Sequence, residues 1–195
     1  MSKLFKKMLL IIIALFALIA LTTSSLSVWE LHNHLTREYK SKGRAISESI
    51  ARSSVEMLLY RDASTVQAIV DQFIEISGVS YVFVVDAEGE FISHTFVPQI
   101  PEDVLKIVKA EKEEDKEKDE TEIMHVDISE IGMIIDIASP ILAGVAGHVH
   151  VGMDKEIINA HIRTAVINQL SLMFAVFLLA VTITYLFGNM ISRPL

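Results

Sequence analysis

The sequence predicts an α+β domain with an antiparallel sheet of about five strands, preceded by a long N-terminal helix and flanked by two transmembrane helices. Two observations lead to this fold class. Long apolar runs lie at both ends of the 195-residue chain, which raises its mean hydropathy to +0.44. Between them, short β-branched runs follow one another through local turns, a connection that favours antiparallel strands.

The first apolar run is predicted to be transmembrane helix 1. Met8–Val28 holds 21 uncharged residues, and a helix of that length spans about 31 Å, close to the bilayer hydrocarbon core of about 30 Å. Residues 1–7 form a lysine-rich N-terminus, and Trp29 is placed as an interfacial anchor. The alternative is a cleaved signal peptide, with Thr22–Ser25 supplying the small residues that a peptidase needs.

The last forty residues predict a single helix that enters the membrane. Asp154 is a suitable N-cap for a membrane-proximal segment (154–169) that continues into transmembrane helix 2 (170–188). Between Asp154 and Pro194 no proline interrupts this helix. Lysines precede the first span and Arg193 follows the second. By the positive-inside rule we expect a two-pass protein with both termini in the cytoplasm and its middle part outside.

The segment between the spans is acidic. Glu30–Arg163 holds all 25 acidic residues and 13 of the 17 basic ones, a net charge of −12. This charge argues against nucleic acid and against anionic lipid headgroups as partners.

The segment 29–60 is predicted to be a membrane-proximal helix that carries an apolar stripe. The stripe consists of Leu31, Leu35, Tyr39, Ile46, Ile50 and Met57, with Lys42 and Ser53 in its two gaps. Two alternatives stay open: the stripe packs on its own domain, or it forms the seam of a parallel homodimer. Different turns of the helix can serve each purpose.

The remaining elements follow in order within the domain 29–153. After an interruption at Tyr60–Ser64, a second helix carries Val66 and Val70 on its apolar face and ends at Gly78. The expected strands and short helix are Ser80–Val85, Phe91–Thr95, the helix Glu102–Ala110, Ile123–Ile128, Met133–Ala138 and Gly147–Gly152. The tract Glu111–Glu122 has no apolar stripe, so we expect a solvated insertion without a function.

Several kinds of chemistry find no support in the sequence. The chain has no cysteine, which excludes disulfides and thiolate metal sites. It contains no nucleophile-elbow, zincin or phosphate-loop motif, and its carboxylates are not predicted to gather in apolar surroundings. We therefore expect no catalytic residues, no cofactor and no enzymatic activity within residues 1–195.

Three segments resemble a known family. Val82–His94, Ala138–Leu142 and Gly147–Gly152 are similar to the single Cache (PAS-like) extracytoplasmic sensor domains of bacterial receptors, and Gly188–Leu195 resembles the start of a HAMP segment. This resemblance implies the input module of a transmembrane receptor of the bacterial inner membrane, whose sensor domain lies in the periplasm or outside the cell and binds a small-molecule ligand. Its output domain would be of the histidine-kinase (two-component), chemotaxis or cyclic-dinucleotide type.

In that interpretation Asp154 would begin the relay helix, and Arg193 and Pro194 would open the HAMP-like segment at 189–195. The alternative is a membrane-anchored periplasmic binding or assembly protein without signalling output, for which the gene is expected to end near Leu195.

The resemblance also implies a ligand pocket on one face of the sheet, bordered by Phe91–Thr95. Ser93-His94 is similar to the Ser-His-Pro segment of citrate and dicarboxylate sensors, whose histidine contacts a ligand carboxylate. Those sensors have an arginine where Phe91 stands, and often a basic residue near the position of Asp136. Without these cations a citrate-like ligand is disfavoured, whereas uncharged, monoanionic and cationic ligands remain open.

The other candidate ligand-binding residues come from the residue pattern. Tyr81 and Phe83 share one face of their strand, and Arg61 is a charge placed at the helix break. For each of them, core packing or a surface ion pair is the competing interpretation. The same applies to His94, although a histidine at a pocket wall both donates and accepts hydrogen bonds.

His148 and His150 lie two residues apart on one strand, so both side chains leave the same face. This spacing is compatible with a metal site that takes His125 or Asp136 as a third ligand. The histidines also simply alternate with Val149 and Val151. Since nothing in the sequence specifies a third ligand, we predict no metal site.

Overall fold

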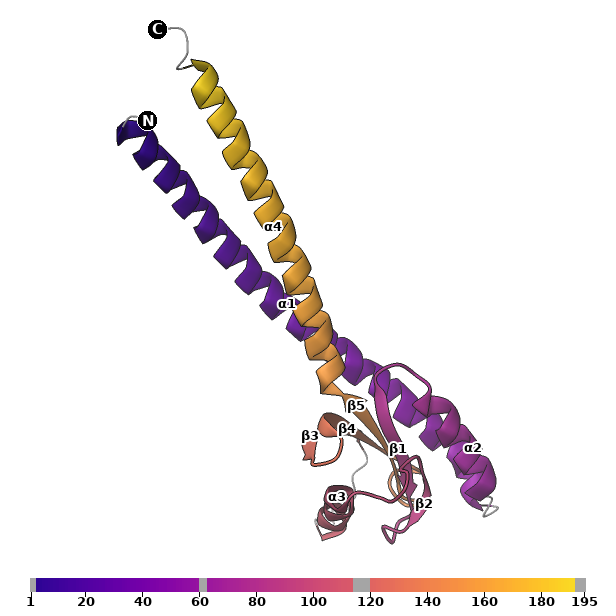
Figure 1. Cartoon of the computed structure of the whole chain (residues 1–195). Helices are drawn as coiled ribbons and strands as arrows, with labels where there is room; N and C mark the ends of the chain where they lie inside the picture. Colours follow the sequence, from indigo (N-terminus) through magenta and orange to yellow (C-terminus); the bar gives the residue numbers. More distant parts are fainter. Residues whose placement is uncertain (1–2, 60–62, 114–119, 192–195) are drawn as a thin grey trace. The chain divides into compact units, whose positions relative to one another are not determined.

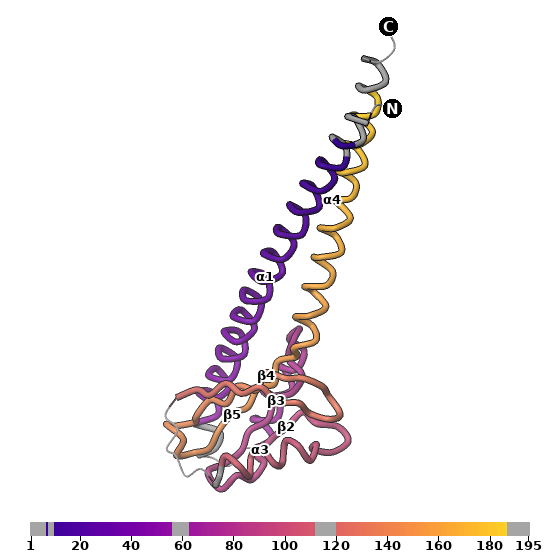
Figure 2. The backbone as a smooth tube through the Cα atoms, turned by 90° about the vertical axis from the view of Figure 1, so that its left-hand side faces the viewer, coloured from indigo at the N-terminus to yellow at the C-terminus, as the bar shows by residue number. Residues whose placement is uncertain are grey.

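The computed structural model of the chain describes residues 3–59, 63–113 and 120–191. The chain divides into two compact units, one made of Met1–His34 with Asn159–Leu195 and the other of Leu35–Ile158. Helix α1 (Lys3–Leu59) and helix α4 (Lys155–Ile191) each contribute residues to both units, and both helices are unbroken (Figure 2). The sequence prediction of one uninterrupted helix through 155–169 and beyond is confirmed.

The first unit is helical throughout its described residues, 3–34 and 159–191. The rings of Phe16 and Phe177 pack with their centroids 5.1 Å apart, and Gln169 Nε2 donates to Ser27 Oγ at 3.5 Å. Large apolar side chains face outward, for example Leu172, which is 67% exposed. Helices α1 and α4 are long and apolar enough to cross a membrane. The boundaries 8–28 and 170–188 stay predictions.

The second unit is built on a five-stranded antiparallel sheet (Figure 1). Its strands are β1 (Val79–Val85), β2 (Phe91–His94), β3 (Glu122–Ile128), β4 (Gly132–Pro140) and β5 (His148–Asp154), arranged in the order β2-β1-β5-β4-β3. The predicted hairpin is present, and Asp86 Oδ1 accepts from the backbone N–H groups of Glu88 and Glu90 in its turn. The predicted α+β fold class is therefore confirmed.

One face of the sheet is covered by helix α3 (Glu102–Glu113), and we call it the α3 face. Residues directly opposite each other in an antiparallel pair lie on the same face. Phe83 is opposite His150, while Tyr81 and Asp136 are both opposite Gly152. The core on this face consists of Tyr81, Phe83, Val85, Phe96, Val104, Val108, Ile128 and Ile134.

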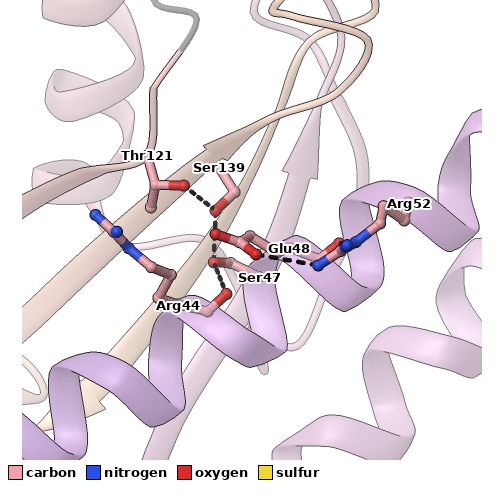
Figure 3. A network of polar contacts seen from close by, with 6 residues as sticks. All are labelled: Arg44, Ser47, Glu48, Arg52, Thr121 and Ser139. Atoms are coloured by element: carbon pink, nitrogen blue, oxygen red, sulfur yellow. Dashed lines mark hydrogen bonds and ion pairs between the residues drawn. The ribbon is translucent and has the colours of Figure 1, made fainter.

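The opposite face is covered by α1 and by helix α2 (Ala63–Ile74), and we call it the α1–α2 face. At Gly43 helix α1 comes so close to the sheet that a Cβ atom would collide with the side chains of Ile137 and Met153. Beside this contact a chain of hydroxyl groups joins α1, β4 and the segment that precedes β3 (Figure 3). Ser47 Oγ on α1 lies 2.7 Å from Ser139 Oγ on β4, which lies 3.0 Å from Thr121 Oγ1, just before β3.

The apolar stripe of α1 packs, in its described central turns, on its own domain. Tyr39, Ile46 and Ile50 are 8%, 6% and 0% exposed within this single chain. These three residues are therefore not available for a dimer seam, because other parts of the same chain already cover them. The exposed face of the same turns carries small and polar residues, among them Ser41, Ala45 and Ser49. Homodimerisation stays a prediction.

Candidate ligand-binding site

A chain of buried polar groups crosses the α3 face. Asp136 on β4 lies at its centre: Tyr81 Oη on β1 donates to Oδ1 at 2.8 Å, and His150 Nδ1 on β5 lies 2.9 Å from Oδ2. Glu111 on α3 brings Oε2 to within 3.1 Å of His150 Nε2. His150 Nε2 is close enough to Glu111 for an ion pair, but the two groups are not aligned for a hydrogen bond. Four elements thus supply one polar group each.

Aromatic packing holds these groups in place. Asp136, His150 and Phe83 are 0% exposed and Tyr81 is 1% exposed. The ring of Phe83 stacks on the imidazole of His150, with centroids 4.4 Å apart and an angle of 8° between the planes. Polar side chains in such an apolar setting must satisfy one another, because water does not reach them. The same packing keeps their geometry precise.

Helix α3, which carries Glu111, is fastened at its other end. Asp103 accepts hydrogen bonds from the backbone N–H and the hydroxyl group of Ser129, in the turn between β3 and β4, and from Lys106 on its own helix. The hydrogen bonds from Lys106 and Ser129 lower the pKa of Asp103 to about 2. Its carboxylate therefore holds the start of α3 at the sheet over the whole physiological pH range.

The protonation states of Tyr81 and His150 follow from their surroundings. Burial and the charge of Asp136 raise the pKa of Tyr81 far above its usual value, so its hydroxyl remains a donor. For His150, burial lowers the pKa, but the carboxylates of Asp136 and Glu111 outweigh this effect and raise the pKa to about 10. His150 is therefore an imidazolium between two acidic side chains at neutral pH.

This raised pKa predicts a pH dependence of stability. A group whose pKa is higher in the folded than in the unfolded state stabilises fully below its unfolded value, about 6.5 for histidine, and loses that contribution as the pH rises towards the folded value. Between pH 6.5 and 10 we expect the local stability of β5 to fall by about 2–4 kcal/mol. Hydrogen exchange of the β5 amides, corrected for intrinsic rates, measures this change. In the variant His150→Gln the fall should be absent; an equal fall there would contradict the assignment.

Gly152 makes room for the ring of Tyr81. A Cβ atom at this position would lie 2.7 Å from Cδ1 of Tyr81 and closer still to other ring atoms. Gly152→Ala is expected to push the ring away from Asp136 and to lower the stability of the unit by about 2–4 kcal/mol, from overpacking and the loss of a hydrogen bond to a charged group. Hydrogen exchange of the β1 and β5 amides would show it. Tyr81→Phe, which removes only the hydroxyl, separates the two causes, and no change in either variant would refute the contact.

Four of the predicted site residues lie on the α3 face: Tyr81, Phe83, Asp136 and His94, which is opposite Phe83. The ring of His94 lies 6.0 Å from that of Phe96, and its buried Nδ1 has no hydrogen-bond partner within the described part of the chain. Ser93 faces the other way and donates to Gln67 Oε1 on α2 at 2.7 Å. Arg61, Arg193 and Pro194 lie outside the described residues.

One expectation about acidic residues was wrong, because Asp136 and Glu111 both lie in apolar surroundings beside His150. Glu111, the first residue of the tract Glu111–Glu122, is therefore not solvated, whereas residues 114–119 lie outside the described part of the chain and the absence of a function for the tract stays a prediction. One signal in the sequence pointed to this site: Asp136 is a lone acid within the apolar run Met133–Ala138, and a buried carboxylate needs partners. Nothing local identified those partners as Tyr81, His150 and Glu111.

His148 and His150 share the α3 face, as the spacing predicted. Across the described ranges, no three His, Asp or Glu side chains are arranged to hold a metal ion.

The site strand leads directly into the long C-terminal helix. His150 and Asp154 belong to β5, and α4 begins at the next residue, Lys155. Asp154 Oδ1 accepts from the N–H of Glu156 at 2.7 Å, which makes it the N-cap that the sequence predicted. Its own N–H donates to the carbonyl of Gly78 at 2.9 Å.

The family model for single Cache domain 3 matches residues 30–166. The chain belongs to this family. A search of curated proteins found no match.

Among solved structures the chain is similar to the sensor domain of Escherichia coli DcuS, with 16% identity, 65% of this chain and 96% of that chain covered, and a TM-score of 0.45. It is also similar to the sensor domain of the histidine kinase DctB of Vibrio cholerae, with 16% identity, 73% and 58% covered, and a TM-score of 0.49. A third similar structure is the periplasmic domain of Vibrio cholerae LuxQ, with 14% identity, 75% and 70% covered, and a TM-score of 0.46.

Proposed function

We propose that this Cache chain is the input module of a two-pass receptor of the bacterial inner membrane. Its Leu35–Ile158 unit lies outside the cytoplasm and binds a small molecule at the α3 face. Helix α4 relays occupancy to a HAMP-linked output domain of the histidine-kinase, chemotaxis or cyclic-dinucleotide type. The proposal is supported by the family, by two helices apolar enough to span a membrane, and by lysines before the first of them.

One observation supports the proposed relay of ligand binding to α4. His150, which contacts Asp136 in the polar chain, lies on the strand whose last residue caps α4. A ligand that changes the contacts of His150 therefore acts on a segment only a few residues from the start of the output helix. The demand on the ligand is modest, since a 100-fold preference for one of two conformations shifts their balance by about 2.7 kcal/mol.

The relay is tested by fusing residue 195 to the HAMP segment and kinase of a characterised receptor with a reporter gene. Small molecules that raise the melting temperature of the chain in detergent micelles are then applied to cells. We expect them to change reporter output in the parent fusion. Inserting four glycines after Arg163 should abolish this change while leaving the thermal shift intact. A ligand that stabilises the chain but never changes the output would favour a binding protein without signalling.

The receptor is proposed to be a parallel homodimer, and cross-linking tests this. Because the chain lacks cysteine, single cysteines form disulfides only with a second copy. On α1 we expect dimers from cysteines at the exposed positions Ser41, Ala45 and Ser49, which lie four residues apart on one helix face. Cysteines at the buried positions Ile46 and Ile50 are the matched controls. No disulfide at any exposed position of α1 would count against the dimer.

A further inference from the structure

The carboxylate of Asp136 is the point at which two donors from neighbouring strands converge. Tyr81 Oη on β1 contacts one oxygen at 2.8 Å and His150 Nδ1 on β5 contacts the other at 2.9 Å. Each donor is nearly or fully shielded from water. A buried phenol and a buried imidazolium aimed at the two oxygens of one carboxylate form a recognition site for that group.

The occupant of this site belongs to the chain itself. Asp136 projects from the middle of β4, and its backbone is paired with Met124 of β3 on one side and with Gly152 of β5 on the other. An external carboxylate would compete against a group that is already in position and lost little freedom on arriving there. It would also place another negative charge beside Asp136 and Glu111, where burial makes like-charge repulsion strong.

We propose that Asp136 is a built-in carboxylate that fills the anion position of the α3-face site, so that the domain rejects carboxylate ligands and takes uncharged or cationic ones. This inference rests on the proposed function only in placing the ligand site on this face. In this proposal Asp136 determines ligand specificity. Without its carboxylate, Tyr81 and His150 would be free to donate hydrogen bonds to an anionic ligand.

Removing the internal group should create a site for an external one. Asp136→Ala deletes one carboxylate and leaves the methyl group, so the vacated space matches formate. Asp136→Asn is the matched control, because its amide keeps the space filled. The experiment uses the full chain in detergent micelles, follows thermal unfolding, and titrates sodium formate against sodium chloride at equal ionic strength. Sodium acetate, one methyl group larger, tests the fit.

We expect formate to raise the melting temperature of Asp136→Ala by about 3 °C or more in a saturable manner. Acetate should have a smaller effect, and sodium chloride none. Neither the wild-type chain nor Asp136→Asn should respond to formate. In Asp136→Ala with Tyr81→Phe the response should weaken at least about 10-fold in formate affinity, because one of the two donors is gone.

Two results would overturn the proposal. The first is an Asp136→Ala chain that unfolds cooperatively yet responds to formate no more than Asp136→Asn does. The second is a wild-type chain that formate, acetate or propionate stabilises, and this result decides the matter even if Asp136→Ala does not fold. Suppose that Asp136→Ala binds formate, while the parent reporter fusion does not respond to any small molecule that stabilises the chain. This combination would uphold the anion position and refute the receptor function.

Discussion

Replacing His150 with alanine is expected to destabilise the sheet unit by about 3–5 kcal/mol, because it leaves the carboxylate of Asp136 buried without its charged partner. His150 is 0% exposed and lies within 2.9 Å of Asp136 and 3.1 Å of Glu111. Losing the imidazole also removes the ring on which Phe83 stacks, so a void adds to the cost. Hydrogen exchange of the β1, β4 and β5 amides in the full chain measures the loss.

Replacing the whole polar chain separates the ion pair from the packing. Changing His150 and Asp136 to leucine together with Tyr81→Phe and Glu111→Leu removes every group that depends on the pair and fills the space, and should cost clearly less than His150→Ala alone. His148→Ala is the matched control, since His148 lies on the same strand and face but is partly exposed. If His150→Ala cost no more than His148→Ala, the buried ion pair would have no part in stability.

The second large effect is expected at Gly147, the residue just before β5. Its φ of +108° is unfavourable for any residue with a side chain, and a Cβ atom there would collide with the carbonyl oxygen of Val85 and lie 2.7 Å from the backbone of Asp86. Backbone atoms cannot move aside as a side chain can. Gly147→Ala should therefore cost about 3 kcal/mol or more and disturb the pairing of β1 with β5.

Gly144→Ala is the comparison variant, because Gly144 also has a positive φ, of 85°, within the same turn. It should cost only about 1 kcal/mol. Hydrogen exchange of the β1 and β5 amides, together with the melting temperature, compares the two variants. Equal effects would mean that backbone conformation alone, without the collision, explains the cost at Gly147.

His150→Ala and Gly147→Ala both affect function through β5. This strand carries His150 at the site and Asp154 at the start of α4. A loss of register between β1 and β5 would move Phe83 away from His150, and a shift by one residue would turn His150 to the other face. We therefore expect Gly147→Ala to uncouple the site from α4, even in molecules that remain folded.

Local patterns in the sequence were enough to predict which elements form. The apolar runs, the strand alternation and the turn residues each depend on neighbours in the chain, so the helices and strands could be assigned from them. The same holds for Asp154, because an N-cap bonds to the backbone two residues away. Tyr81 and Phe83 were placed on one face by the period of a strand alone.

Tertiary structure decided how those elements combine into a site. Tyr81 and Asp136 are 55 residues apart and meet only because β1 and β4 flank β5. The contact of Glu111 with His150 depends on where α3 covers the sheet, and no local pattern records that position. The side of the sheet that Ser93 faces, and the burial of the α1 stripe, likewise follow from long-range packing, because burial is a property of the partner surface and a residue's own neighbours in the chain do not encode it.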